Sequence, residues 1–249
     1  MDHHELKRCL LGMNMTTMAE QFASLARTAE HEGWSYEHYL FETVSLEQQS
    51  RWERKLQKLL RDSRLPLSKS LDTLDRVRLP RTLNQQIDAL AEGSFLDRCE
   101  NVLAFGNPGS GKTHIICALG HELIQQGRKV LFKNCELLVQ ELLIAKRSYA
   151  LPQALKKFRR YQALIIDDIG YVQQSREEME VLFTLLADRY ETASTLITSN
   201  LAFSQWERIF KDPMTTAAAI DRLVHHSMIL ELTLPSYRLE HATKEKPYA

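Results

Sequence analysis

Apolar residues in the first quarter of the chain recur at the three- and four-residue spacing of amphipathic helices. They fall at Leu6, Leu10 and Met13, and then at Met18, Phe22, Leu25 and Ala29. Gly33 ends the second stretch, and Trp34-Ser35 resembles a hydrophobic staple and N-cap for a long helix that runs to about Arg61. Residues 1–62 are therefore predicted to form a small all-helical N-terminal domain.

The pattern changes twice after this helical region. Residues 63–81 contain Pro66 and Pro80 and show little periodicity, which predicts a linker. From residue 82, apolar runs with strand character alternate with helical runs. Strands are expected at 101–105, 129–132, 163–168, 194–200 and 228–232. Helices are expected at 83–91, from near Lys112, at 136–147, from Pro152 and at 175–190, and two short helices are expected after residue 200. Such alternation predicts an α/β domain over 82–249, with a parallel sheet covered on both faces.

One strand-to-helix connection fits the phosphate-binding loop pattern G-x-x-x-x-G-K-[ST]. It reads Gly-Asn-Pro-Gly-Ser-Gly-Lys-Thr and lies between a predicted strand and a predicted helix, as the motif requires. Glycines let backbone N–H groups wrap an anion, and the positive end of the helix dipole points at the phosphates. We therefore predict a nucleoside triphosphate site. Its residues are Gly106, Asn107, Pro108, Gly109, Ser110, Gly111, Lys112, Thr113 and His114.

The chemistry of the site assigns further roles. Lys112 is expected to reach the β- and γ-phosphates, and the Thr113 hydroxyl to complete a Mg²⁺ shell shared with phosphate oxygens. Asp167 and Asp168 end a predicted strand, and the strand beside a phosphate loop carries an acid at its carboxyl end. We expect Asp167 to hold the metal and Asp168 to polarise the attacking water as general base. A strand end capped by acids is the competing, purely structural interpretation.

The next predicted strand ends in Thr198-Ser199-Asn200. A polar residue at this place can lie near the γ-phosphate and position water. Serine and asparagine are also ordinary caps between a strand and a helix. The residues alone leave both interpretations open.

Composition narrows the classes of protein. Apolar residues make up 44% and charged residues 26%, as in an ordinary globular protein with a sizeable core. The formal net charge is zero, so affinity for nucleic acid must come from local patches. The four scattered cysteines predict buried small residues rather than disulfides or zinc ligands. The N-terminus has no secretion signal, and no apolar run approaches about 18 residues, so a cytoplasmic protein without a membrane partner is expected.

Two tracts are rich in basic residues and poor in acids. The candidate DNA-contacting residues in them are Arg51, Arg54, Lys55, Lys58, Lys146, Arg147, Lys156, Lys157, Arg159 and Arg160. Such clusters can neutralise DNA phosphates and bind duplexes without reading their sequence. Charge runs are more often solvated helix faces, and the charges alone favour that simpler interpretation.

Taken together, these motifs resemble those of the AAA+ ATPases, and within them the IstB-like transposition helpers and the related DnaC-type helicase loaders. The resemblance covers essentially the whole chain and rests on the segments Glu100–His114, Leu164–Tyr171, Thr198–Asn200 and Ile220–His226. It implies that Asn200 occupies the sensor-1 position, and that Arg222 reaches the nucleotide of a neighbouring subunit. The Asp167-Asp168 pair departs from the Asp-Glu pair common in AAA+ proteins, although this subgroup uses both.

The resemblance also implies a function. The chain would bind ATP and Mg²⁺, hydrolyse ATP slowly, self-associate into an ATP-dependent homo-oligomer on duplex DNA, and help a cognate transposase to engage its target. Residues 1–62 would serve DNA or partner binding and oligomerisation, residues 82–249 would form the ATPase domain, and the basic tracts would contact DNA. The alternatives are a DnaC-type helicase loader, a small-molecule phosphotransferase and a scaffold that uses ATP only for assembly.

Overall fold

The computed structural model describes residues 3–169, 175–201, 205–206, 217, 220–221 and 223–237. The chain divides into two compact units, Met1–Lys58 and Leu59–Ala249. The division falls inside helix α3 (Tyr36–Ser63), and the boundary expected at residue 62 lies in the same helix.

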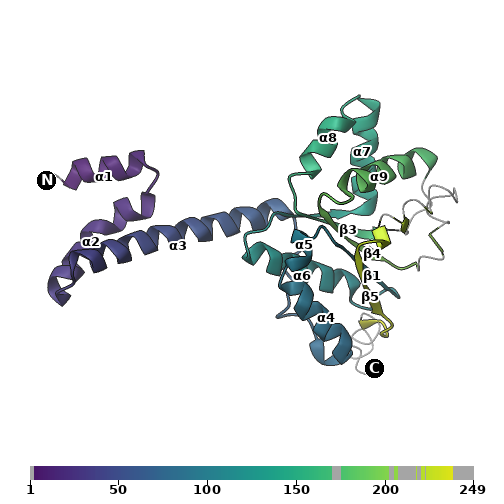
Figure 1. Ribbon diagram of the computed structural model, residues 1–249, viewed down its shortest axis with the longest axis horizontal. Helices are drawn as coiled ribbons and strands as arrows, with labels where there is room; N and C mark the ends of the chain where they lie inside the picture. Colours follow the sequence, from purple (N-terminus) through teal and green to yellow (C-terminus); the bar gives the residue numbers. More distant parts are fainter. Residues whose placement is uncertain are drawn as a thin grey trace, which may run out of the picture. The chain divides into compact units, whose positions relative to one another are not determined.

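The first unit is helical, as the apolar spacing predicts. It contains α1 (His3–Gly12), α2 (Thr16–Glu32) and the first part of α3 (Figure 1). Gly33 ends α2 in the left-handed conformation, with φ at 67°, which glycine adopts without a steric penalty. The Ser35 hydroxyl accepts the His38 N–H at 3.2 Å and caps the start of α3. The small core of the unit is made of Leu10, Ala19 and Phe22.

A buried carboxylate joins the helices of this unit. Glu47 on α3 is only 4% exposed and accepts the Met18 N–H at 2.9 Å. Arg51 and Arg54 lie 2.8 and 3.4 Å from the same carboxylate. Burial raises the pKa of Glu47, but the Met18 N–H and Arg51 outweigh burial and hold the pKa below its ordinary value of 4.5. The folded unit therefore favours the ionised form of Glu47.

The second unit is built on a five-stranded parallel sheet with strand order β2-β3-β4-β1-β5 (Figure 1). The strands are β1 (Asn101–Gly106), β2 (Val130–Asn134), β3 (Ala163–Ile169), β4 (Ser194–Ser199) and β5 (Ser227–Leu232). The helices are α4 (Arg81–Ala91), α5 (Ser94–Asp97), α6 (Lys112–Gln125), α7 (Cys135–Arg147), α8 (Leu151–Phe158) and α9 (Arg176–Arg189), with a short 3₁₀ helix η1 (Arg76–Arg78).

Helices cover both faces of this sheet, which confirms the predicted fold class. Strand residues alternate between two cores, because neighbouring side chains point to opposite faces. Val102 packs with α4, α5 and α6, whereas Leu103 packs with α7, α8 and α9. In β3, Ile165 belongs to the first core and Ile166 to the second.

The strand order corrects one expectation about the acids. The neighbour of β1 on the side of β3 is β4, so Asp167 and Asp168 on β3 do not lie on the strand next to the loop. Val102 pairs with Leu196 of β4, and Leu196 pairs in turn with Ile165 of β3. Strand β4 therefore lies between β1, which leads into the phosphate loop, and β3, which carries the acids.

Residues 63–81 also differ from the expected linker. They belong to the second compact unit, where Leu65 and Leu79 are buried in the core around α6. His121 of α6 lies within hydrogen-bond distance of the Pro66 carbonyl, at 3.1 Å. Proline and weak periodicity indicated irregular backbone correctly, but irregular backbone can still be packed.

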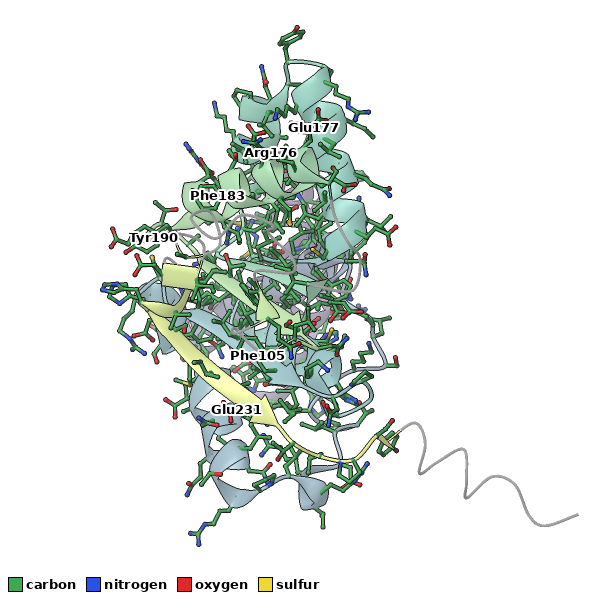
Figure 2. The ribbon with its side chains drawn as sticks, turned by 90° about the vertical axis from the view of Figure 1, so that its right-hand side faces the viewer. Phe105, Arg176, Glu177, Phe183, Tyr190 and Glu231 are labelled. Carbon is green, nitrogen blue, oxygen red and sulfur yellow. The ribbon has the colours of Figure 1, made fainter. Side chains whose placement is uncertain are left out.

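Helix α9 lies against the second core, and Figure 2 shows Arg176 near one end of it and Tyr190 at the other. The helix begins at Ser175, whose hydroxyl and the Glu178 carboxylate form a capping box. It ends at Arg189, which is buried and donates to the carbonyls of Phe158, Tyr161 and Ser194. Burial lowers the pKa of Arg189 to about 10, so the guanidinium stays charged at neutral pH. Figure 2 also shows β5 with Glu231, at the outer edge of the sheet.

The cysteines are free, as predicted, but not all of them are buried. Cys117 and Cys135 are buried, Cys99 is partly exposed and Cys9 is exposed. Burial raises the pKa of the Cys117 thiol to about 12, which keeps it protonated at neutral pH. Among the described residues, none of the helices is both long and apolar enough to span a membrane.

Candidate nucleotide site

The phosphate loop connects β1 to α6 in the conformation that its glycines allow. Gly106, Gly109 and Gly111 have φ angles of 150°, 80° and 101°, which side chains disfavour. A Cβ on Gly106 would also collide with the Leu232 carbonyl oxygen of β5. The loop therefore requires glycine both for its backbone angles and for its close approach to β5.

Two polar side chains of the loop suit an anion. Lys112 is 6% exposed, and its ammonium group donates to the carbonyls of Gly106 and Asn107, both at 2.8 Å. The Ser110 hydroxyl is buried and has no hydrogen-bond partner among the described residues. A buried polar group without a partner costs free energy, and a phosphate oxygen would satisfy it. The loop thus fits a triphosphate by its own chemistry.

The predicted metal ligands are held together by hydrogen bonds. The Thr113 hydroxyl donates to Oδ1 of Asp167 at 2.8 Å, and the Thr198 hydroxyl donates to the same oxygen at 2.7 Å. Among the described residues, no cluster of three or more His, Cys, Asp or Glu could hold a metal alone. Mg²⁺ is commonly bound by one or two protein groups plus substrate phosphates, so the Thr113–Asp167 pair fits it.

Asp168 is placed by the same end of β4. Its N–H donates to the Thr198 hydroxyl at 2.8 Å, and Asn200 Nδ2 donates to its Oδ1 at 3.0 Å. Asp168 has a φ of 68°, and the β3–β4 register shifts between Ile166 and Ile169. A bulge with a left-handed residue turns a side chain out of the regular alternation. The bulge therefore directs the two neighbouring acids to different partners.

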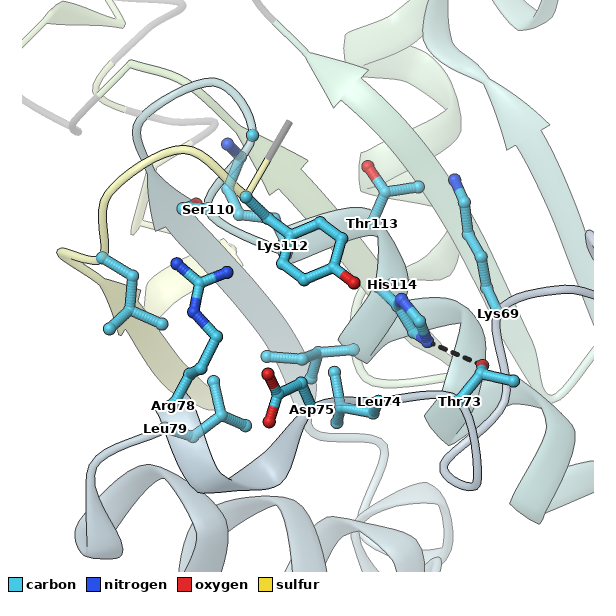
Figure 3. Close-up of a pocket in the computed structure, with 15 residues that line it drawn as sticks. Lys69, Thr73, Leu74, Asp75, Arg78, Leu79, Ser110, Lys112, Thr113 and His114 are labelled. Carbon is cyan, nitrogen blue, oxygen red and sulfur yellow. Dashed lines mark hydrogen bonds between the residues drawn. The ribbon is translucent and has the colours of Figure 1, made fainter. Parts of the chain in front are cut away.

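A cavity of about 220 Å³ adjoins the phosphate loop. Figure 3 shows Leu74, Asp75, Arg78 and Leu79 along one side, facing Ser110, Lys112 and Thr113 of the loop and the start of α6. His114 joins the two sides, because its Nε2 lies 3.1 Å from the Thr73 hydroxyl and 3.0 Å from the Ser70 carbonyl. Residues 63–81 thus supply one wall of the candidate site.

The sequence interpretation missed three parts of this site. Six residues between positions 69 and 79 line the cavity, and so do Leu234 and Tyr237, which follow β5. Thr198 was noted only as part of a polar strand end, yet its hydroxyl contacts both acids. For Thr198, the polar run at the end of a strand was a usable signal. No periodicity or motif marks the wall residues.

Most of the candidate DNA-contacting residues are engaged in ion pairs. Six of them pair with acids: Arg51, Arg54, Lys146, Arg147, Lys157 and Arg159. Lys55 lies over the Trp52 ring, 4.7 Å from its centroid. Lys58, Lys156 and Arg160 are exposed and make no ion pair with a described residue. The sequence predicts charge but not pairing, because the partner acids come from other helices or from other turns of the same helix.

Arg222 lies outside the described residues, as do most of the residues expected to form two short helices after β4. Its assignment as a residue of a shared site therefore stays a prediction.

A phosphate loop on a parallel sheet, acids on β3 and polar residues at the end of β4 define a P-loop nucleotide-binding protein of the AAA+ class. The model of the family described as IstB-like ATP binding protein matches residues 9–245. The chain belongs to the IstB-like ATP-binding family.

Relatives agree with this assignment. An insertion sequence ATP-binding protein of Sinorhizobium fredii is 37% identical over 246 residues, covering 98% of this chain and 83% of the relative. An IS21 ATP-binding protein of Pseudomonas aeruginosa is 35% identical over 241 residues, covering 97% and 91%. The crystal structure of the DnaC helicase loader matches with a TM-score of 0.58 at 19% identity, over 67% of this chain and 98% of that one. The structure of DnaA from Aquifex aeolicus matches with a TM-score of 0.56 at 13% identity, over 75% of this chain and 57% of that one. These two structures support the fold alone.

Proposed function

We propose that this protein is an ATP-hydrolysing DNA-binding protein that assembles on duplex DNA and assists the transposase of an insertion sequence. The observation that carries the proposal is the hydrogen-bonded set at the end of β4. There Thr198 contacts both Asp167 and Asp168, and Asn200 contacts Asp168. Asp167 also accepts a hydrogen bond from Thr113 at the start of α6. Relatives described as insertion sequence ATP-binding proteins favour transposition over helicase loading, since the DnaC likeness is one of fold.

The residues support hydrolysis by attack of water on the γ-phosphorus. A bond forms between the water oxygen and phosphorus while the bond to the β–γ bridging oxygen breaks, and ADP and phosphate leave. Asp168, oriented by Asn200, accepts the proton of the water. The Lys112 ammonium exchanges its loop carbonyls for phosphate oxygens and offsets the developing charge. Bound Mg²⁺, held by Thr113 and Asp167, would supply further positive charge to the phosphate oxygens.

Phosphate release tests the enzymatic part of this proposal. The parent protein should release phosphate from ATP with Mg²⁺, faster when duplex DNA is present. Lys112→Ala should lose ATP binding and hydrolysis together, because the loop loses the cation that its phosphates require. Lys129→Ala removes an exposed lysine that directly precedes β2 and serves as the matched control. An equal ATP affinity in Lys112→Ala and Lys129→Ala would contradict the site.

Arg222 is proposed to complete the nucleotide site of a neighbouring subunit. If it does, assembly and hydrolysis are coupled, since an isolated subunit lacks one charge that stabilises the transition state. Arg222→Ala should bind ATP but not hydrolyse it. Mixing Arg222→Ala with Lys112→Ala should restore part of the activity, because the second variant donates its arginine to an intact loop. If the mixture stays inactive, or if Arg222→Ala alone is fully active, the shared site is wrong.

A further inference from the structure

The chain folds back over the phosphate loop after β5. We call residues Thr233–Tyr237 the C-terminal strap. The Tyr237 N–H donates to the Gly109 carbonyl at 3.0 Å, and Ser236 lies so close to Gly109 that a Cβ there would collide with its hydroxyl. Leu234 packs against the core that contains α6. The C-terminal strap is therefore attached both to the loop and to the core beneath it.

The C-terminal strap gives the cavity an aromatic side. Leu234 and Tyr237 line it, and so do Leu74, Arg78 and Leu79. The last three residues are labelled in Figure 3. The Arg78 guanidinium carbon lies 5.1 Å from the centroid of the Tyr237 ring, within the range of a cation–π contact. Leucine side chains and an aromatic ring suit a flat, uncharged aromatic group, whereas the adjoining loop suits phosphates. A nucleotide combines both kinds of group in one molecule.

We propose that the C-terminal strap forms the base-contacting wall of the nucleotide site, with Tyr237 stacked on the nucleobase and Arg78 positioning the Tyr237 ring. This inference rests on the proposed function, because it assumes that ATP occupies the phosphate loop. The backbone bond between Tyr237 and Gly109 links the two halves of the site. Bound base and bound phosphates thus hold the C-terminal strap and the loop in one arrangement.

Binding of ATP compared with binding of inorganic tripolyphosphate tests the inference on the full-length protein. Tyr237→Ala should weaken ATP binding by about tenfold, as expected for the loss of one base–aromatic stack, and leave tripolyphosphate binding unchanged. Tyr237→Phe keeps the ring and the backbone N–H, so it should regain most of the lost ATP affinity. Tyr149→Ala removes a tyrosine that is 93% exposed and is the control for the same chemical change.

Arg78 needs a separate readout because it acts through Tyr237. Arg78→Ala should weaken ATP binding in the parent background and add little in the Tyr237→Ala background, since residues that act as a unit are not additive. Tyr237→Trp places a fluorophore at the same position, and its emission should change with ATP but not with tripolyphosphate.

The outcomes distinguish a failure of the base contact by Tyr237 from a failure of the proposed function. If Tyr237→Ala leaves ATP affinity unchanged, or weakens ATP and tripolyphosphate equally, Tyr237 does not contact the base and the inference is overturned while the proposed function stands. If the parent protein binds neither ligand, the proposed function and the inference both fail. Tyr237 is 42% exposed, so its replacement should leave the fold intact, and an unchanged circular dichroism spectrum would verify this.

Discussion

Replacement of Thr198 by valine is the sharpest perturbation of the candidate site, because the shape is kept and only the hydroxyl is lost. The hydroxyl donates to the Asp167 carboxylate at 2.7 Å and accepts the Asp168 N–H at 2.8 Å. A hydrogen bond to a charged group contributes about 1.5–3 kcal/mol, and an N–H left without a partner costs about 1–3 kcal/mol when buried. Because Asp168 is only partly buried, we take values toward the low ends of both ranges and expect about 2.5–4 kcal/mol less stability for the second unit.

Thr195→Val is the matched control on the same strand. Its hydroxyl lies 3.3 Å from Arg189 Nε, and Arg189 keeps three carbonyl acceptors, so we expect a loss of about 1 kcal/mol or less. Thr198→Val should also lower the rate of ATP hydrolysis at saturating ATP, since both acids lose a contact that orients them. Thr195→Val should hydrolyse ATP at the parental rate.

Urea unfolding followed by the fluorescence of Trp206 measures the stability of the second unit. Trp206 is fully buried there, and a Trp34→Phe/Trp52→Phe background removes the other two tryptophans, which belong to the first unit. If Thr198→Val unfolds within about 0.5 kcal/mol of the parent, as ordinary surface changes do, and hydrolyses ATP at the parental rate, the reasoning about this hydroxyl is refuted.

Three further perturbations test other parts of the account. Asp168→Asn should keep ATP binding and stop phosphate release, because it keeps the shape and removes the base; a variant that hydrolyses at the parental rate would exclude Asp168 as the base. Neutralising Lys156 and Arg160 should make the slope of the logarithm of the duplex-binding constant against the logarithm of salt concentration less steep, by about 0.9 for each lost phosphate contact. An unaltered slope would leave the two residues as solvated residues without a DNA contact. Glu47 has a lowered pKa, so its stabilisation is present above pH 4.5 and is lost as pH falls through the folded-state value. The melting temperature of the first unit should therefore fall in acid for the parent and depend less on pH for Glu47→Gln. Equal dependence of the melting temperature on pH in the two proteins would contradict this role of Glu47.

Regular elements followed directly from the sequence. The predicted long helix begins at its Ser35 cap, and α9 begins at its Ser175 cap, because these signals are local and each satisfies a nearby backbone N–H. The apolar runs gave all five strands to within two residues. Strand order was not predicted, since which strand lies between β1 and β3 depends on connections that periodicity does not encode.

The residues of the candidate site likewise fall into those that a local motif predicts and those that depend on the tertiary structure. The phosphate loop is a contiguous motif, so Lys112 and Thr113 were identified from the sequence with their neighbours. The contacts of Thr198 with both acids depend on a bulge in β3 and on the placement of β4, which no local pattern reveals. The cavity wall at residues 69–79 was taken for a linker, because its packing comes from a few leucines and from His114 rather than from a helical stripe.

In the proposed function, ATP bound on this phosphate loop drives assembly of the protein on duplex DNA. The most direct test is the mass of the protein–DNA complex by analytical ultracentrifugation, with and without ATP, for the parent and for Lys112→Ala. We expect a large complex only for the parent with ATP and DNA present together. A complex of the same mass without ATP, or with Lys112→Ala, would contradict it.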